Sequence, residues 1–492
     1  MKRNGRRTVL LLILVLVGIA TLLISCQSET DDGSVDGVAA SEVVAKIGDY
    51  TITKDELKER LAQAVRPQRD DAGLPKAPVT VESLLRTLVA EKAMVIEGRK
   101  LGRLDDAILS ASVNRVRQRQ LIRLLLTDYV TKNVPVTASE IDQEIQTDPN
   151  LTREQAEMKV RSARATPVVE QYYADLLKKF KVEKVKENFS KAAQVHQRLA
   201  TRPVEPRPRG MYWITNQQIR TELSDEERSM PLVRYVGGKF TLLQWFQTLG
   251  EMAPPGRPKN LNRPEGVEAL LDRGLRPVVF EVEAVDQGYD KNEEFVAELR
   301  KYEDRVLLGK AKTDKYKEIE QPTDEEIKAF FEEHRANFAK PASVKIEPIW
   351  CPDMETAEKV KGLLADGATP ASVNETHGLR KDLRAYNAYP TSEGIFWDNL
   401  WKAQPSTVVG PVKGFYEAGI KWRVVKVLEK TPSEEQPFSD GVKQQVKSAI
   451  TSARRDELMS RYEADLLKKH PHEIHLDKIQ DIDPLEVTPD DE

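Results

Sequence analysis

The chain has 492 residues, of which 40% are hydrophobic and 31% are charged. Such a length predicts roughly two to four domains, and the composition is typical of a surface-rich protein made of many amphipathic helices. The formal net charge is −4, and it becomes −8 once the four basic residues among the first seven are set aside. An acidic body argues against nucleic acid as the main partner.

The first 25 residues have the composition of a signal peptide. A basic stretch, Met1–Arg7, precedes the apolar run Val9–Ile24, whose 16 residues are few for a membrane-spanning helix. Leu23-Ile24-Ser25-Cys26 then resembles a bacterial lipoprotein box, in which the chain is cleaved before a cysteine that becomes lipidated. The resemblance implies a signal peptide over 1–25 and a lipid anchor at Cys26. The alternative is an uncleaved anchor helix.

The residue after the cysteine bears on the compartment. By resemblance to the sorting rules of Gram-negative bacteria, Gln27 implies the periplasmic face of the outer membrane. Residues 26–42 are polar and predict a flexible tether, which would hold the body near a membrane without placing it inside. Cys351 is the only other cysteine, so an acylated Cys26 leaves no intramolecular disulfide.

A helical region is predicted over residues 43–195. Val43–Thr53 reads as a short hairpin, and Thr53 with Glu56 as the start of a helix. Apolar residues at helical spacing continue through 84–102, 106–130 and 168–180. Val44–Thr53 is similar to the opening of the mature chain in SurA/PrsA-type foldases, and the resemblance implies a chaperone region.

The same pattern returns later in the chain. A counterpart lies 186 positions later for each of four residues: Leu84, Gly102, Thr127 and Thr137. The segment Ala174–Lys179, in contrast, recurs as Ala464–Lys469 at an offset of 290 residues. The difference of 104 residues predicts a small domain inserted into the second copy. We therefore expect a linker over 196–230, a second repeat over 231–341, its closing helix within 436–480, and an acidic disordered tail over 481–492.

The inserted stretch, 343–430, has the pattern strand, helix, loop, strand, which predicts a small α+β domain. Phe396–Pro405, Val409–Val412 and Val424–Lys430 resemble the second half of a parvulin-type peptidyl-prolyl isomerase domain. The predicted fold is thus mainly helical: a duplicated SurA-like chaperone region whose second copy carries an inserted parvulin-like (rotamase) domain.

The resemblance also identifies candidate site residues. Parvulins carry two buried histidines, and Pro348 and Arg423 stand in their places. Leu383, Phe396 and Ser392 fall on the three positions of the family's proline pocket, the third being a methionine in the family. Leu383 and Phe396 could equally be core residues, and Arg423 is expected at a solvated strand end. No catalytic residue is assigned.

No other chemistry is indicated. His470, His472 and His475 lie close together in the sequence and are expected at the surface, and elsewhere no cluster has metal-ligand spacing. No phosphate loop or nucleophile elbow is present, so we expect neither a metal nor a cofactor. Four of six tryptophans, at 350, 397, 401 and 422, lie in the parvulin-like stretch, as core or as a groove for unfolded chain. The prediction is a lipid-anchored envelope chaperone that binds unfolded or nascent polypeptides, including outer-membrane proteins, through a degenerate isomerase domain. An active isomerase and a non-catalytic assembly scaffold are the alternatives.

Overall fold

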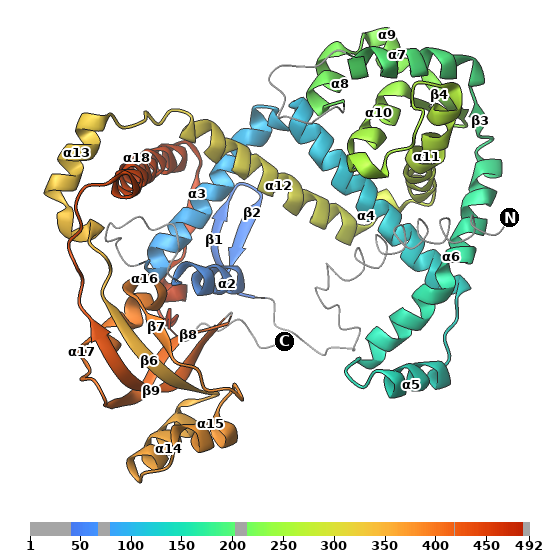
Figure 1. Cartoon of the computed structure of the whole chain (residues 1–492). Coiled ribbons are helices and arrows are strands. Elements are labelled where there is room, and N and C mark those ends of the chain that lie inside the picture. The colour runs from blue at the N-terminus through green and yellow to red at the C-terminus, as the bar shows by residue number, and fades with distance from the viewer. Residues whose placement is uncertain (1–40, 67–78, 202–213, 418, 486–492) are drawn as a thin grey trace. The chain divides into compact units, whose positions relative to one another are not determined.

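The computed structural model describes residues 41–66, 79–201, 214–417 and 419–485 (Figure 1). The predicted signal peptide, Cys26, most of the tether and the last residues of the acidic tail lie outside them. The chain divides into two compact units. Among the described residues, 107–201 and 214–303 form the first unit, and 41–66, 79–106, 304–417 and 419–485 form the second. Within the described ranges, no helix is both long enough and apolar enough to cross a membrane.

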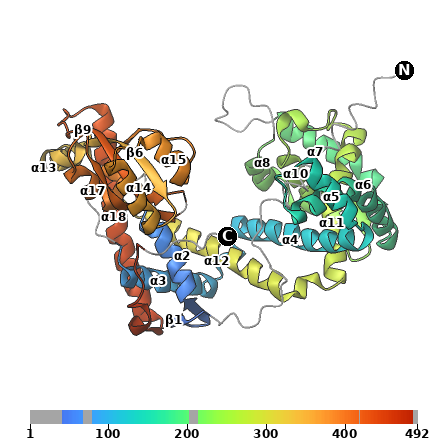
Figure 2. The same ribbon diagram turned by 90° about the horizontal axis from the view of Figure 1, so that it is seen from below.

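The first unit is almost entirely helical. Its helices are α4 (Ala107–Asn133), α5 (Ala138–Thr147), α6 (Arg153–Lys179), α7 (Phe189–Thr201), α8 (Asn216–Glu222), α9 (Asp225–Ser229), α10 (Leu242–Gly250), α11 (Pro264–Asp286) and the first half of α12 (Glu293–Tyr316). A three-stranded sheet joins them, in the order β3 (Glu183–Lys184), β4 (Pro231–Tyr235) and β5 (Gly238–Thr241). Helix α11 lies beside α4 and α6, as Figure 2 shows.

The core of this unit forms around the aromatic residues of α6, α10 and α11. Trp245 and Phe246 are fully buried and meet edge to face at 5.0 Å, and the Trp245 indole donates to the Val267 carbonyl at 3.0 Å. Tyr173 packs on Phe280 at 5.7 Å. Aromatic burial of this extent is a major part of the stability of a helical unit.

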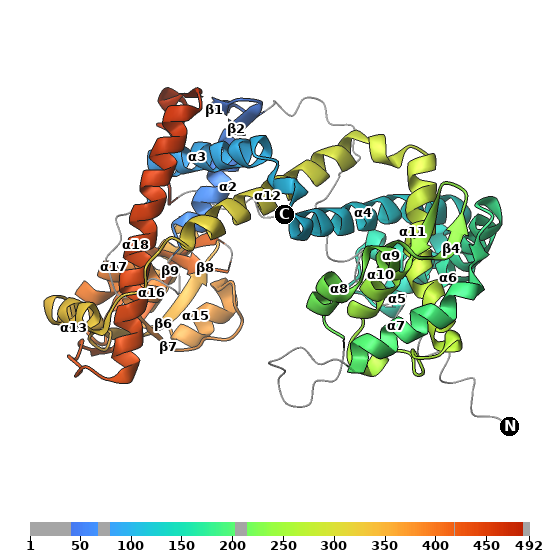
Figure 3. The same cartoon turned by 90° about the horizontal axis from the view of Figure 1, so that it is seen from above.

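The second unit contains the N-terminal hairpin and the C-terminal half of the chain. Its helical part consists of β1 (Val43–Ile47), β2 (Tyr50–Thr53), α2 (Lys54–Ala64), α3 (Val81–Lys100), the end of α12, α13 (Asp324–Glu333), α18 (Asp440–Lys469) and β10 (His472–Ile474). The sheet order is β10-β1-β2. The long helix α18 crosses α3, as Figure 3 shows.

A small α+β domain lies between α13 and α18. Its elements are β6 (Ser343–Cys351), α14 (Met354–Ala365), α15 (Pro370–His377), β7 (Tyr386–Ala388), α16 (Pro390–Glu393), α17 (Trp397–Lys402), β8 (Val408–Tyr416) and β9 (Gly419–Thr431). The sheet is antiparallel in the order β7-β6-β9-β8. One face carries a cluster with Ile346, Leu400 and Val425, and the other carries Ile349, Val360 and Val424 under α14. The predicted fold, mainly helical with one small α+β domain, is confirmed.

The two compact units do not coincide with the two sequence repeats. The core of the first unit combines α6, which closes the first repeat, with the β4–β5 hairpin of the second. The core of the second unit combines the β1–β2 hairpin with α18, which closes the second repeat. The strands follow the same exchange, since β3 pairs with β4 and β10 pairs with β1. Both hairpins offer an equivalent apolar edge, so the repeat pattern alone does not tell which closing helix each one receives.

The segment 196–230, expected as a linker, is partly helical in the described residues. It contains the end of α7 and the whole of α8 and α9. Capping boxes begin the last two, with Thr215 accepting from the Gln218 amide and Ser224 from the Glu227 amide, both at 3.2 Å. Ile219 of α8 and Leu223, which follows α8, are buried. These helices were not predicted because few apolar residues stand between the polar ones in this segment.

Candidate functional site

Arg423 is the most deeply buried cationic residue described in the small α+β domain. It lies on β9 directly opposite Trp350 of β6, and it is only 1% exposed. Side chains alternate between the faces of a strand, so Arg423 shares a face with Val425 and Val427 of the apolar cluster. The expectation that Arg423 is a solvated strand end is therefore wrong, because its register position points it into the domain.

Glu393 neutralises this buried charge. The Arg423 guanidinium donates to Glu393 Oε2 over 2.5 Å, and the glutamate side chain is 6% exposed. Glu393 is the last residue of α16, and the backbone then turns at Gly394, where φ is +50°. A glycine adopts this conformation at little cost. The helix end thus places a carboxylate beside a strand residue 30 positions further along the chain.

Aromatic rings and a glycine complete the surroundings of the guanidinium. Its carbon lies 4.9 Å from the centre of the Trp350 ring, which is cation–π geometry. A Cβ on Gly414 would come within 2.5 Å of that carbon, so the absence of a side chain there makes the room. Partial burial raises the pKa of Tyr386, and the nearby charge of Arg423 opposes the rise. Arg423 Nε is buried without a hydrogen-bond partner.

Pro348 lies on the same sheet face as Arg423. It precedes Trp350 by two residues on β6 and faces Val425 across the sheet, and it is buried. Proline has neither a backbone N–H nor a polar side chain. The structure therefore brings Pro348 and Arg423 to one face. Of these two positions, neither carries an imidazole, and only Arg423 carries a polar side chain.

The three predicted pocket residues do not form one surface. Leu383 joins the cluster under α14, on the opposite face from Arg423. Phe396 is buried, with its ring edge against Phe415 at 4.9 Å. Ser392 is exposed, and its hydroxyl accepts from the Tyr389 amide at 2.9 Å at the start of α16. Only Phe396 is thus both apolar and close to the elements that carry Arg423 and Glu393.

Comparison with known proteins shows what this domain resembles. Residues 322–443 match the family model of the PPIC-type PPIase (peptidyl-prolyl isomerase) domain. We refer to residues 322–443 as the PPIC-type domain. The matched range contains the whole four-stranded sheet, together with α13 and the first residues of α18. The resemblance to parvulins is confirmed for this range.

Solved structures that are similar to parts of this chain are described as SurA-like chaperones, a foldase and a peptidylprolyl isomerase. One, from Campylobacter jejuni, belongs to work on PEB4 and Cj1289, called SurA-like chaperones; it is 16% identical, covers 46% of this chain and 90% of its own, and has a TM-score of 0.22. Foldase protein PrsA of Streptococcus pneumoniae is 16% identical, with coverages of 38% and 71% and a TM-score of 0.23. PrsA of Bacillus cereus is 15% identical, with coverages of 49% and 92% and a TM-score of 0.21. No curated protein matches this chain.

Sequence reasoning missed three residues of the PPIC-type domain site: Glu393, Tyr386 and Gly414. One signal was available. An arginine in the alternating run Arg423, Val425, Val427 points inward, and a buried cation requires a carboxylate. The sequence offers several acidic residues nearby, however, and only the fold selects Glu393.

Cys351 is a buried free cysteine at the end of β6 in the PPIC-type domain. Burial raises the pKa of the Cys351 thiol to about 11, so the thiol stays protonated at neutral pH. Across the described residues, no group of three histidine, cysteine, aspartate or glutamate side chains could hold a metal ion.

Proposed function

We propose that this protein is a lipid-anchored extracytoplasmic chaperone that binds unfolded or nascent polypeptides, and that its PPIC-type domain isomerises prolyl bonds at close to the uncatalysed rate. The observation that carries the proposal is the buried Arg423–Glu393 ion pair at the position of a family histidine. The signal peptide and lipidation at Cys26 are inferred from sequence, and with Gln27 they favour the periplasmic face of an outer membrane, where outer-membrane proteins would be clients.

The ion pair argues against catalysis for a physical reason. Rotation about a prolyl bond must overcome a barrier of roughly 18–20 kcal/mol, and an enzyme lowers it by binding the twisted amide better than the planar one. Here the guanidinium is already neutralised by Glu393, and Pro348 supplies no hydrogen bond. Losing two contacts of ~1–3 kcal/mol each removes roughly one to four powers of ten in rate, at about 1.4 kcal/mol per tenfold.

Apolar surface on the same domain supports polypeptide binding. Leu379, Tyr386 and Ile395 are 41%, 39% and 51% exposed. Trp397 and Trp401 stack at 5.4 Å on α17 and are only partly buried. Flat apolar side chains of this kind bind unfolded chain without a strict sequence requirement.

Exchange spectroscopy tests the catalytic half of the proposal. Cis–trans exchange of a short proline peptide is measured by NMR with and without the protein, and we expect the two rates to agree within a factor of two. A catalytic efficiency like that of an intact parvulin, abolished by Phe396→Ala, would show instead an active isomerase whose site tolerates the substitutions.

A second assay separates a general chaperone from a scaffold. Suppression of aggregation of an unfolded substrate is compared for the protein and for the paired variant Leu379→Ser with Ile395→Ser. We expect clear suppression by the unchanged protein and a loss of several-fold in the variant. Equal, negligible suppression by both would favour a scaffold that serves one envelope complex.

A further inference from the structure

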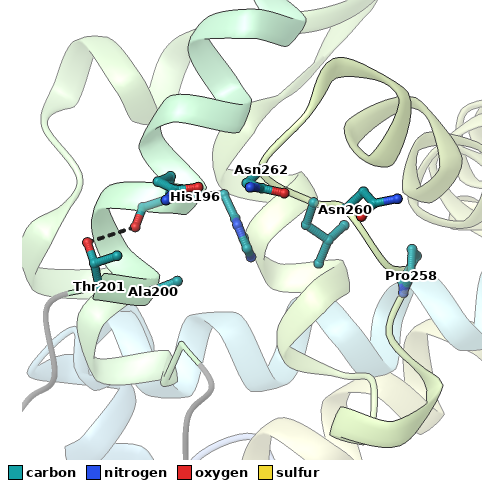
Figure 4. Close-up of a pocket in the computed structure, with 8 residues that line it drawn as sticks. His196, Ala200, Thr201, Pro258, Asn260 and Asn262 are labelled. Atoms are coloured by element: carbon teal, nitrogen blue, oxygen red, sulfur yellow. Dashed lines mark hydrogen bonds between the residues drawn. The ribbon is translucent and has the colours of Figure 1, made fainter.

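The first unit contains a cavity of about 280 Å³ between α7 and the loop that leads into α11 (Figure 4). Its lining residues are His196, Gln197, Ala200, Thr201, Pro258, Asn260, Leu261 and Asn262. Figure 4 shows the His196 ring reaching from α7 toward the loop. Three of the side chains are carboxamides, each of which has two N–H donors.

His196 is held in an aromatic setting that keeps it uncharged. Its ring stacks on Phe246 at 6.4 Å and meets the edge of Trp245 at 6.1 Å. Burial, with a contribution from the positive charge of Arg257, lowers the pKa of His196 to about 4. Its Nδ1 atom is buried, and no hydrogen bond joins it to any described residue. The lining therefore has no formal charge at neutral pH.

Unpaired cations alternate with the lining residues of the loop. Arg257, Lys259 and Arg263 flank Pro258 and Asn262 in the sequence, and none of the three has a carboxylate within ion-pair distance among the residues described. Their local potential is therefore positive, although the chain as a whole has a net charge of −4.

Cations on the neighbouring helix behave differently. On α7, Lys191 pairs with Glu226 at 2.6 Å, and Arg198 pairs with Glu227 at 2.7 Å. Both cations of α7 are thus compensated by a carboxylate, whereas the three cations of the loop are not. An uncompensated positive loop beside a cavity rich in N–H donors favours an anion.

The loop is held in place without a ligand. Asn260 has a φ of +62°, and its carbonyl accepts from the Arg263 amide at 2.9 Å. A Cβ on Gly266 would come within 2.0 Å of that carbonyl oxygen, so the loop rests directly on α11. Arg257 Nε donates to the Met252 carbonyl at 3.1 Å. Such preorganisation reduces the entropy cost of binding.

We propose that this cavity binds a carboxylate carried by an otherwise uncharged ligand about one amino-acid residue in size, as at the C-terminus of a polypeptide. The cations of the loop lie next to the lining residues but do not line the cavity themselves. A multiply charged ion would lose its hydration there without contacting a cation, so the site suits a ligand with a single negative charge. Ala200, Pro258 and Leu261 give the ligand's side chain an apolar contact. The site lies outside the PPIC-type domain and does not depend on the proposed function.

Matched ligands test the role of the carboxylate in the full-length chain. N-acetylleucine and N-acetylleucinamide differ only in that group, and inorganic phosphate serves as a small anion without an apolar part. Binding is followed by calorimetry and by the NMR titration of isotope-labelled His196. We expect the acid to bind at least tenfold more tightly than the amide, and to raise the pKa of His196 because a bound anion favours the imidazolium.

Two variants of equal charge change locate the site. Arg257→Gln should weaken binding of the acid at least fivefold, whereas Arg220→Gln, at an exposed arginine of α8, should leave it unchanged. Equal binding of acid and amide would overturn the proposal, as would displacement of the acid by equimolar phosphate. Loss of binding in both variants would also overturn it, because only the overall charge would then matter.

Discussion

At the scale of single residues, the buried pair Arg423–Glu393 gives the sharpest stability prediction. Glu393→Gln leaves a buried guanidinium without its carboxylate, which costs about 3–5 kcal/mol. We expect the denaturant midpoint of the PPIC-type domain, followed by tryptophan fluorescence, to fall accordingly.

A double variant provides the control for that measurement. The double variant Arg423→Met with Glu393→Met leaves no buried charge without a partner. Replacements of a buried ion pair by apolar residues are often neutral or stabilising. We expect it to be much more stable than Glu393→Gln alone. A Glu393→Gln protein as stable as the unchanged one would mean that the pair contributes nothing.

His196 makes the first unit sensitive to acid. Its folded pKa of about 4 lies below the ordinary value of 6.5, so the unfolded chain binds more protons between these values. This contribution to stability is complete above pH 6.5 and is lost as the pH falls toward 4. After allowance for partial exposure it amounts to on the order of 2 kcal/mol. Thermal unfolding of unchanged and His196→Gln proteins from pH 7.5 to 4.5 should show a smaller acid loss in the variant; parallel curves would contradict the assignment.

Cys26 lies outside the described residues, and its role stays a prediction. Cys26→Ala should prevent lipid attachment and processing of residues 1–25, because the thiol is the acceptor. Mass spectrometry and membrane partition after high-salt washing check this. Partition of the variant equal to that of the unchanged protein would show that something other than the lipid anchors it.

The residues also show where sequence reasoning ends. The family pattern assigned Pro348 and Arg423 to the positions of two histidines, but the burial of Arg423 was not predicted, since the arginine was expected at a solvated strand end. The partner of Arg423 could not be found, since Glu393 reaches it only through the turn at Gly394 and the fold of α16. Leu383 and Ser392 were assigned by alignment position alone, and their side chains serve the α14 cluster and a helix cap.

At the scale of elements, the ends of the inserted domain meet. Lys340 and Glu434 form an isolated bridge, with backbone hydrogen bonds of 2.8 and 3.2 Å in the two directions. Outside the bridge, Ile327 and Phe331 of α13 pack with Val446 of α18 in a cluster of their own. The helices therefore have a contact surface that does not use the sheet.

Excision of residues 343–430 follows as an experiment. With a short Gly/Ser connection in their place, the bridge geometry should allow the chain to close, and the helical frame should keep its cooperative unfolding. Circular dichroism melts of the shortened and unchanged chains measure this. Non-cooperative melting would show that the PPIC-type domain is an integral part of the unit.

At the scale of the whole molecule, the repeat could be predicted from the sequence. The exchange, in which the hairpin of each repeat packs against the closing helix of the other, could not. The offsets of 186 and 290 residues located the duplicated elements and the insertion between them. Helices α6 and α18 share the ending Ala-Asp-Leu-Leu-Lys-Lys, so their apolar residues fit either hairpin equally well. The choice depends on tertiary contacts, among them Lys179 with Glu283 at 2.6 Å, which ties α6 of the first repeat to α11 of the second.

Two fragments of the chain therefore differ in a way that the repeat pattern would not predict. Fragment 107–303 contains both sides of the Trp245 core, including Tyr173 of α6 and Phe280 of α11, and we expect it to fold alone with one cooperative transition. Fragment 43–201 contains the complete first repeat, 43–195, yet it separates Tyr173 and Leu176 from every partner in the second repeat, and it leaves the β1–β2 hairpin without Leu466 of α18. Domains are stable by only about 5–15 kcal/mol, and the free energy lost with these apolar contacts exceeds that margin. We therefore expect this fragment to unfold or aggregate. Calorimetry and amide exchange on both fragments decide the matter. A cooperative first-repeat fragment beside an unfolded 107–303 would show that each repeat folds on its own closing helix, and that the exchange does not define the folding units.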